Sequence, residues 1–361
     1  MAERAGERVT LQTLADALGV SRTTVSNAFN RPDQLNPALR ERVLALAGEL
    51  GYGGPDPAGR ALRSGRSGAI AVMFTEGLSF AFDDPAAIAT LGGLAAVAER
   101  AAASLVLLPA SVSSTGGPTA ESVRSAIFDG LLIYSMPEQH PGVSAALERR
   151  VPIVVADAPR IPGVPFVGID DRGGARAAAA HLAELGHRHI GVVTFRLRAD
   201  DHKGFVDAER RYRASYGVTA ERLEGYAEGL TAAGLDWDAM PIYETGPNLR
   251  TRGAVATRAL LALDPRPTAL LATSDELALG VLDAARELGL AVPGDVSVVG
   301  YDDAPAAALT TPALTTIRQP IVEKGRTGGR MLLEALDGGA PDDVLLPTEL
   351  VVRDSSAPLR P

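Results

Sequence analysis

The first thirty residues carry apolar side chains at helical spacing, interrupted once by a glycine. Four of them share one face of a predicted helix: Leu11, Leu14, Ala15 and Leu18. Thr10 is suited to cap the start of this helix, and Gly19 to form the sharp turn after it. Ser21 is suited to cap a second helix over Arg22–Phe29, so the pattern is typical of a helix-turn-helix.

A third helix is predicted to begin at Asn36, with Pro37 in its first turn and Gly51 after its end. Its expected inner face holds Val43, Leu44, Ala47 and Leu50. The three predicted helices would form one small α-helical domain at the start of the chain.

From Gly68 onward, short apolar runs alternate with helical patterns. The runs read AIAVMF, SLVLLPA, GLLIYS, PIVVAD, HIGVVTF, ALLATSD and VSVVGYD. Helices are predicted between them, for example over residues 88–103 and 173–185. Continuous apolar strands joined by helical crossovers indicate parallel sheets covered by helices on both faces. About 290 residues of this pattern predict two α/β lobes.

The composition narrows the class of protein. The chain has 361 residues, too many for one ordinary core, and 22% of them are charged, as in other globular proteins. It has no cysteine, which excludes disulfides, thiolate zinc sites and cysteine nucleophiles. No apolar run reaches the roughly 18 residues of a membrane span. Because Met1–Thr10 also lacks the apolar core of a secretory signal, we expect a cytoplasmic protein with no membrane partner.

The net charge of −9 is unusual for a protein that binds nucleic acid, but the charge is unevenly distributed. Residues 1–68 hold nine arginines and seven acidic residues, a net charge of +2, and the remainder carries −11. The acidic excess therefore lies outside the helical domain. A net charge of +2 is modest, so charge alone does not establish DNA binding.

The second predicted helix offers side chains that suit DNA recognition. Arg22 has the chemistry to pair with guanine and Asn27 with adenine, whereas Thr10, Thr24 and Asn30 are candidates for phosphate contacts. The predicted DNA-binding residues of this domain are Thr10, Ser21, Arg22, Thr23, Thr24, Ser26, Asn27 and Asn30. The alternative is a three-helix bundle in which the threonines and serines only cap helices.

Several longer stretches carry a resemblance to one family of proteins. They resemble the lactose-repressor (LacI/GalR) family of bacterial transcription regulators, in the family's order: VTLQTLADALGVSRTTVSNAFNRP, LNPALRERVLALAGELGY, HLAELGHRHIGVV, TSDELALGVL and DVSVVGYDDAPAAALTTPALTTIRQP. The resemblance implies a helix-turn-helix DNA-binding domain over residues 1–54, a hinge helix or linker over 55–66, and an effector-binding and dimerisation domain over 67–361. It implies that this last domain is α/β, with two doubly wound parallel lobes of the periplasmic-binding-protein type I fold.

The hinge helix of this family enters the minor groove, where a leucine wedges between base steps. The residues that match this element are Ala58, Arg60 and Leu62. Asn27 stands where many relatives carry arginine, which implies a different base preference.

The resemblance also implies that the chain crosses between the lobes three times. We expect the crossings near residues 168, 300 and 319. The amino-terminal lobe would then comprise about 67–168 and 301–318, and the carboxy-terminal lobe about 169–300 and 319–361.

The effector is expected between the lobes, beyond the carboxyl ends of the strands. Candidate contacts are Phe80, Phe82, Asp83, Asp157, Asp170, Arg222, Asn248 and Asp275. Aromatic and acidic side chains suit stacking on a sugar and recognition of its hydroxyls. Alternatives remain for several of these residues: a packed loop for Phe80 and Phe82, a helix cap for Asp275, and a solvated helix start for Arg222. Phe74, inside a strand, is expected to pack in the core.

Residues 196–217 are longer and more charged than the usual loop of the family. One hypothesis is a lid that closes the cleft and sets effector identity. The other is a flexible, solvated excursion.

The expected function is a sequence-specific, DNA-binding transcription regulator that acts as a repressor. A small-molecule effector would control its affinity for a near-palindromic double-stranded operator. A sugar is the expected effector, and the alternatives are a purine or nucleoside effector, or a sugar-binding protein without a DNA function.

No enzyme motif stands out in the chain. There is no Gly-x-Ser-x-Gly elbow or phosphate-binding loop, and His187 and His189 lie in a predicted helix-to-strand turn. We therefore expect no catalytic residue, metal or cofactor. The C-terminal VVRDSSAPLRP has no heptad repeat, so we predict a homodimer.

Overall fold

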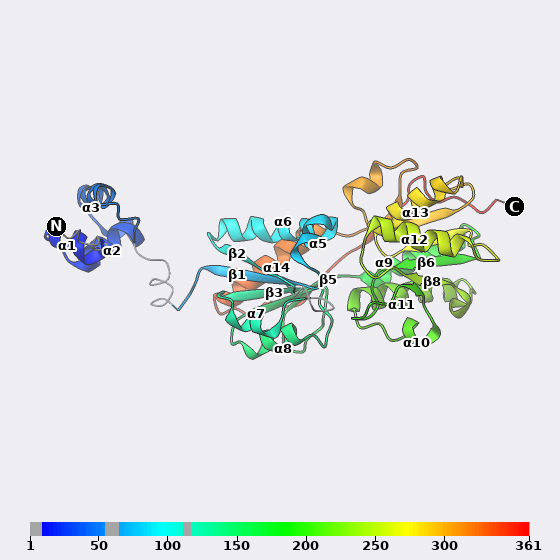
Figure 1. The fold of residues 1–361 in the computed structure, drawn as a ribbon, viewed down its shortest axis with the longest axis horizontal. Helices are drawn as coiled ribbons and strands as arrows, with labels where there is room; N and C mark the ends of the chain where they lie inside the picture. Colours follow the sequence, from blue (N-terminus) through cyan, green and yellow to red (C-terminus); the bar gives the residue numbers. More distant parts are fainter. Residues whose placement is uncertain (1–8, 55–64, 111–116, 361) are drawn as a thin grey trace, which may run out of the picture. The chain divides into compact units, whose positions relative to one another are not determined.

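The computed structural model of the protein describes residues 9–54, 65–110 and 117–360 (Figure 1). By its internal contacts the chain separates into two units, Met1–Gly68 and Ala69–Pro361. The predicted hinge residues Ala58, Arg60 and Leu62 lie outside the described residues.

The first unit is α-helical, as the spacing of its apolar residues predicts. Its elements are α1 (Leu11–Leu18), α2 (Arg22–Asn30), the 3-10 turn η1 (Pro32–Gln34) and α3 (Pro37–Glu49). Oγ1 of Thr10 accepts a hydrogen bond from the Thr13 amide at 3.2 Å, and Oγ of Ser21 accepts one from the Thr24 amide at 3.0 Å. Gly19 ends α1 with a left-handed φ of 65°. The predicted caps and turn are therefore confirmed.

The inner face of α3 differs from the prediction. Val43 and Ala47 are buried, but Leu44 and Leu50, expected on the same face, are 37% and 41% exposed. The prediction for Leu44 and Leu50 was wrong. Leu44 lies a quarter-turn around the helix from Val43, and Leu50 is the C-cap, where the helix ends.

Every apolar run predicted after Gly68 forms a strand. The amino-terminal lobe has the strand order β12-β5-β4-β3-β1-β2, and all of these neighbours are parallel. Its strands are β1 (Ala69–Phe74), β2 (Ser104–Leu108), β3 (Gly130–Tyr134), β4 (Ile153–Ala156), β5 (Phe166–Ile169) and β12 (Val344–Leu346).

The carboxy-terminal lobe has the strand order β13-β11-β10-β9-β6-β8-β7. Its strands are β6 (Ile190–Thr194), β7 (Gly204–Phe205), β8 (Ile242–Glu244), β9 (Ala269–Ala272), β10 (Ser297–Asp302), β11 (Thr315–Arg318) and β13 (Glu349–Val351). The inner strands are parallel, and the edge strands β7 and β13 pair antiparallel. These two sheets confirm the predicted α/β class.

Helices cover both faces of each sheet (Figure 1). The amino-terminal lobe has α5 (Leu78–Asp83), α6 (Pro85–Arg100), α7 (Ala120–Ser125), α8 (Pro141–Glu148) and α14 (Ile321–Leu336). The carboxy-terminal lobe has α9 (Asp171–Glu184), α10 (Ala208–Arg211), α11 (Gly217–Ala232), α12 (Arg250–Leu261), α13 (Asp275–Glu287), η2 (Trp237–Ala239) and η3 (Pro305–Ala308). Each of these helices is too short or too polar to span a lipid bilayer, as is every other helix among the described residues.

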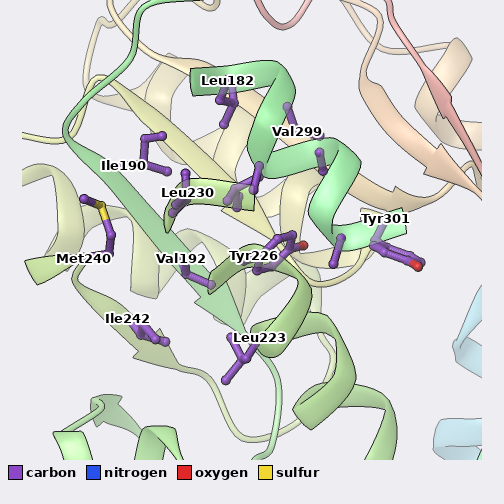
Figure 2. Close-up of a cluster of buried hydrophobic side chains, with 14 of the residues drawn as sticks. Leu182, Ile190, Val192, Leu223, Tyr226, Leu230, Met240, Ile242, Val299 and Tyr301 are labelled. Carbon is purple, nitrogen blue, oxygen red and sulfur yellow. The ribbon is translucent and has the colours of Figure 1, made fainter. Parts of the chain in front are cut away.

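The core follows from the alternation of side chains along the strands. In β1, Ile70 and Val72 pack with α6 and α14, whereas Ala71 and Met73 pack with α8 on the other face. In the carboxy-terminal lobe, helices α9 and α11 pack against β6 and its neighbours through residues such as Tyr226, which is fully buried (Figure 2).

The lobe boundaries differ from those expected. The chain crosses between lobes after β5, after β11 and after β12, so residues 301–318 belong to the carboxy-terminal lobe and 321–346 to the amino-terminal lobe. No crossing lies near residue 300, because β10 continues through η3 into β11 of the same described sheet. Helix α14 joins the other lobe by packing closely on α6. A Cβ on Gly93 or Gly325 would lie 2.1 Å from a backbone oxygen of the facing helix.

The charged segment 196–217 is attached to the carboxy-terminal lobe. β7 extends the sheet by pairing with β8, and Arg210 is buried. Nε of Arg210 lies 2.5 Å from Oε2 of Glu244, and its Nη2 lies 2.6 Å from Oδ1 of Asp200. This packing does not fit a freely solvated excursion.

Candidate functional site

Helix α2 carries the predicted DNA-contacting side chains away from its buried residues Val25 and Ala28. The predicted residues of this unit are exposed or half-buried: Thr10, Ser21, Arg22, Thr23, Thr24, Ser26, Asn27 and Asn30. Nδ2 of Asn30 donates a hydrogen bond to the backbone oxygen of Ser26 at 3.1 Å. Arg22 and Asn27 make no side-chain hydrogen bond to another described residue, so both are available to an external partner.

A cavity of about 130 Å³ lies between the two lobes, at the carboxyl ends of their strands. Segments that follow β1, β3, β4 and β6 contribute to it, together with Asp302, the last residue of β10. The charged side chains in its lining are Glu76, Asp84, Asp157, Arg196, Arg222, Asp302 and Lys324. Aromatic walls come from Phe74, Tyr134, Phe195 and Tyr216. The cavity therefore combines apolar faces with a dense set of carboxylates.

Three of the residues predicted to contact an effector line this cavity: Asp157, Arg222 and Asn248. Asp83 is exposed, and its neighbour Asp84 lines the cavity instead. Phe82 is 55% exposed. Phe80 belongs to α5, but its side chain lies outside the described part of the structure.

The structure places the other two predicted aspartates away from the cavity. Asp170 caps α9 by accepting a hydrogen bond from the Gly173 amide at 2.8 Å. It lines a larger, open groove between the lobes, which shares only Asp157 and Val218 with the cavity. Asp275 is buried, with Oδ1 accepting from the Thr316 hydroxyl at 2.6 Å and Oδ2 from the Ala304 amide at 2.8 Å.

The Arg222 side chain is fixed by hydrogen bonds to residues that do not line the cavity. Its Nε donates to Oδ1 of Asp171 at 2.7 Å and its Nη1 to the backbone oxygen of Thr273 at 2.5 Å. The guanidinium lies 3.7 Å from the ring centroid of Tyr301. Because the residue is only 4% exposed, its charge is fixed in place before any ligand binds.

Burial shifts four of the carboxylates at or near the cavity, Asp84, Asp171, Asp275 and Asp302, towards their protonated forms. It raises the pKa of Asp84 to about 6, against the hydrogen bonds from the Ala87 and Ala86 amides. Burial also raises the pKa of Asp171 to about 6, opposed by the charge of Arg222. The pKa values of Asp275 and Asp302 are raised by burial and, for Asp275, by the charge of Asp302.

No metal site is evident near these groups. Within residues 9–54, 65–110 and 117–360, no cluster of three or more His, Asp or Glu side chains has a geometry that would hold a metal ion. The ring of His187 is buried in hydrogen bonds to the side chains of Thr268 and Ser297 at 2.9 and 3.1 Å.

Comparison with known proteins gives the family. Residues 10–54 match the family "Bacterial regulatory proteins, lacI family", and residues 179–356 match "Periplasmic binding protein-like domain". An HTH-type transcriptional regulator of Mycobacterium tuberculosis is 43% identical over 352 residues, which cover 97% of this chain and 98% of that protein. The chain belongs to the lacI family of bacterial regulatory proteins. The resemblance in the sequence is thereby confirmed.

Two solved structures extend the comparison of this LacI-family chain. The lac repressor dimer bound to operator and the anti-inducer ONPF is 27% identical with a TM-score of 0.78, and the match covers 97% of this chain and all of that one. A complex of the transcriptional regulator CelR with cellobiose is 30% identical with a TM-score of 0.68, covering 96% and 100%. The protein is a DNA-binding transcription regulator with a periplasmic-binding-protein-like domain, and its named relatives are regulators rather than enzymes.

Several residues that line the cavity of this LacI-family regulator were missed in the sequence. Asp302 ends the strand VSVVGYD, so the rule that strand ends meet ligands could have found it. Lys324 interrupts the apolar face that Ile321, Gly328 and Met331 form on α14, which is the one local sign of its role. The ion pair between Glu76 and Arg196 had no local signal, because its partners are 120 residues apart.

Proposed function

We propose that this LacI-family regulator is a homodimeric repressor whose hold on a near-palindromic operator is controlled by a neutral sugar bound between its lobes. The observation that carries the sugar assignment is the cavity lining. Asp84, Asp157 and Asp302 offer carboxylate oxygens to ligand hydroxyls, and Phe74 and Phe195 offer apolar faces to a sugar ring.

The relatives support the same assignment. The CelR structure contains cellobiose, and the lac repressor structure contains a dimer on its operator. We therefore propose that Asp84, Asp157, Arg222, Asn248 and Asp302 contact the effector, and that they bind it without turnover.

For the operator, we propose that α2 enters the major groove. Arg22 would pair with guanine and Asn27 with adenine, and Thr10, Thr24 and Asn30 would contact phosphates. We assign the residues Ala58, Arg60 and Leu62 to the minor groove at the operator centre. Each half of a dimer would read one half-site.

A gel-shift experiment tests this function. The full chain is incubated with operator DNA identified by selection from a random palindromic library. Neutral sugars, sugar phosphates and nucleosides are then added separately. We expect a neutral sugar to change the fraction of bound DNA. A response to nucleosides alone would contradict the sugar assignment, and failure to select any DNA would contradict the regulatory role.

The adjacent residues Asp83 and Asp84 provide a matched pair of variants. Asp84→Asn should bind operator normally, because asparagine still caps α6, but should lose most of its response to the sugar. Asp83→Asn should behave as wild type, because Asp83 is exposed. Equal responses of the two variants would place the sugar elsewhere.

A further inference from the structure

A buried lysine stands in the floor of the cavity. Lys324 is 2% exposed and belongs to α14, between Ile321 and Gly328 on the helix face that packs into the amino-terminal lobe. Its Nζ donates to Oδ2 of Asp157 at 2.7 Å and to Oε1 of Gln319 at 3.2 Å. A charge is rarely buried so completely unless it is paired, so the position has a specific requirement for this residue.

The use of lysine in this chain is itself informative. The sequence holds 33 arginines and only two lysines, and the second, Lys203, is exposed. A guanidinium is a broad planar fork, whereas an ammonium is a compact point charge with three donors. A chain that otherwise uses arginine keeps lysine where a compact cation must fit between Asp157 and Gln319.

Asp157 has an acceptor to spare. It follows β4 with a left-handed φ of 67°, a conformation that costs energy for a residue with a Cβ. Lys324 occupies its Oδ2, but Oδ1 is buried and accepts no hydrogen bond within the described part of the chain. A buried acceptor without a donor is unfavourable, and a ligand hydroxyl would satisfy it.

The cations that line the cavity are already neutralised. Lys324 pairs with Asp157, Arg196 lies 2.5 Å from Glu76, and Arg222 lies 2.7 Å from Asp171. Two helix N-termini at the cavity, which often bind phosphate, are capped internally by Asp84 on α6 and by Ser274 on α13. A phosphorylated ligand would therefore bring charge that this lining does not compensate.

We propose that Lys324 is a specificity-determining residue: by holding Oδ2 of Asp157 it presents Oδ1 to a hydroxyl of a neutral sugar and keeps phosphorylated sugars out. This inference rests on the proposed function and names the class of sugar that the cavity accepts. Lys324 thus acts through Asp157, and the two residues form one recognition unit.

The pair can be separated by measuring selectivity as well as affinity. Calorimetry on the full chain first identifies the tightest neutral sugar from a panel of monosaccharides and sugar alcohols, and its phosphate ester is titrated alongside. In Asp157→Asn, the charge of Lys324 has no carboxylate partner. We expect the neutral sugar to bind roughly 10- to 100-fold more weakly than to wild type. The affinity for the phosphate ester, relative to that for the neutral sugar, should rise at least about tenfold.

The double variant Asp157→Asn with Lys324→Gln is the decisive comparison. It removes both charges together and replaces them with two neutral amides, so the variant can fold without a buried, unpaired ion. We expect the gain for the phosphate ester to disappear, while the neutral sugar stays weak. Lys203→Met, at the exposed lysine, should change neither ligand.

The outcomes separate this inference from the function it rests on. Suppose that wild type binds a neutral sugar. If it binds the phosphate ester equally tightly, or if Asp157→Asn leaves the selectivity between the two ligands unchanged, the role of Lys324 is overturned and the proposed function stands. If wild type binds nucleosides and no neutral polyol, both are overturned. A loss of sugar affinity in the double variant with the phosphate gain retained would also exclude Lys324.

Discussion

Among the side chains that line the cavity, Asp84 has its charge transition close to neutral pH. Asp84 caps the start of α6, lines the cavity and has its pKa raised to about 6, mainly by burial. Glu276 raises this pKa further and Lys324 lowers it. A modest change of pH therefore changes what the cavity offers to a ligand.

Sugar affinity should depend on pH through Asp84. A ligand hydroxyl donates to the ionised carboxylate, so the sugar competes with the proton for it, and affinity falls as the pH falls through about 6. We expect constant affinity above pH 7 and a loss of roughly tenfold between pH 7 and pH 5, measured by calorimetry. Asp84→Asn should make the profile shallower, while Asp302, whose pKa burial also raises to about 6, accounts for the pH dependence that remains. An unchanged slope in that variant would exclude Asp84 as a source.

Asp275, in contrast, is a carboxylate that stabilises the fold through buried hydrogen bonds. Replacing it with alanine leaves the Thr316 hydroxyl and the Ala304 amide buried without acceptors, which should lower the free energy of unfolding by about 2–4 kcal/mol. Denaturant unfolding measures this, and Asp201→Ala, at an exposed position, should change it by less than about 0.5 kcal/mol.

The same residue predicts a pH dependence of stability. Its pKa is raised in the folded state, so the folded protein binds the proton more tightly than the unfolded chain. Its contribution to stability is therefore greatest at low pH and is lost as the pH rises through the folded pKa. Asp275→Asn should be more destabilising, relative to wild type, at pH 5 than at pH 8.

Among the elements, the charged segment 196–217, which contains β7 and α10, is anchored to its sheet by a buried ion pair. Glu244 of β8 is fully buried and accepts hydrogen bonds from Arg210 and from the Leu197 amide, which ties α10 and the start of the segment to the sheet. Arg196 and Tyr216, at its margins, line the cavity, whereas residues 200–212 do not. The segment therefore reaches the cavity through its ends, and the lid hypothesis is restricted to those ends.

Arg210→Met tests this anchoring. It would leave Glu244 buried without its cation, which should cost about 3–5 kcal/mol of stability in urea unfolding. Arg213→Met is the matched control, because Arg213 lies three residues away and its side chain is 73% exposed. If Arg210→Met loses no more free energy of unfolding than Arg213→Met, the ion pair contributes little to stability.

At the level of the effector domain, the lobes meet across the cavity through charges. Arg196 follows β6 in one lobe and Glu76 follows β1 in the other, and their atoms lie 2.5 Å apart. The side chains are 15% and 28% exposed, so solvent screens the pair only in part. We propose that this contact stabilises the lobes in the arrangement that encloses the cavity, so that ligand binding and closure would reinforce each other.

Glu76→Gln should weaken this closure. We expect the sugar concentration that gives half of the full effect on operator binding to rise about fivefold, which is equivalent to roughly 1 kcal/mol. The affinity for the operator in the absence of sugar should be nearly unchanged. Glu148→Gln breaks an exposed ion pair with Arg124 and serves as control. No shift in Glu76→Gln would show that the pair is not coupled to the ligand.

The local pattern was sufficient wherever the decisive interactions are local. Helix caps at Thr10 and Ser21, the turn at Gly19 and the apolar strands depend on neighbours a few residues away, and the sequence predicts them correctly. The alternation of strands and helices also predicted the two α/β lobes, and the family resemblance added the expectation of an effector between them. The position of Asp157 at a strand end and the family match of Arg222 correctly indicated two residues of one cavity.

Only the tertiary structure decided which lobe contains α14 and which side chains contact each other across the cavity. Lys324 meets Asp157 from 167 residues away, and Arg196 meets Glu76 from 120. The energy of a buried charge depends on its partner and its desolvation, and neither is a property of the neighbouring sequence. The alternation of apolar residues therefore determined the elements, while the packing of α14 on the amino-terminal sheet determined the composition of the cavity.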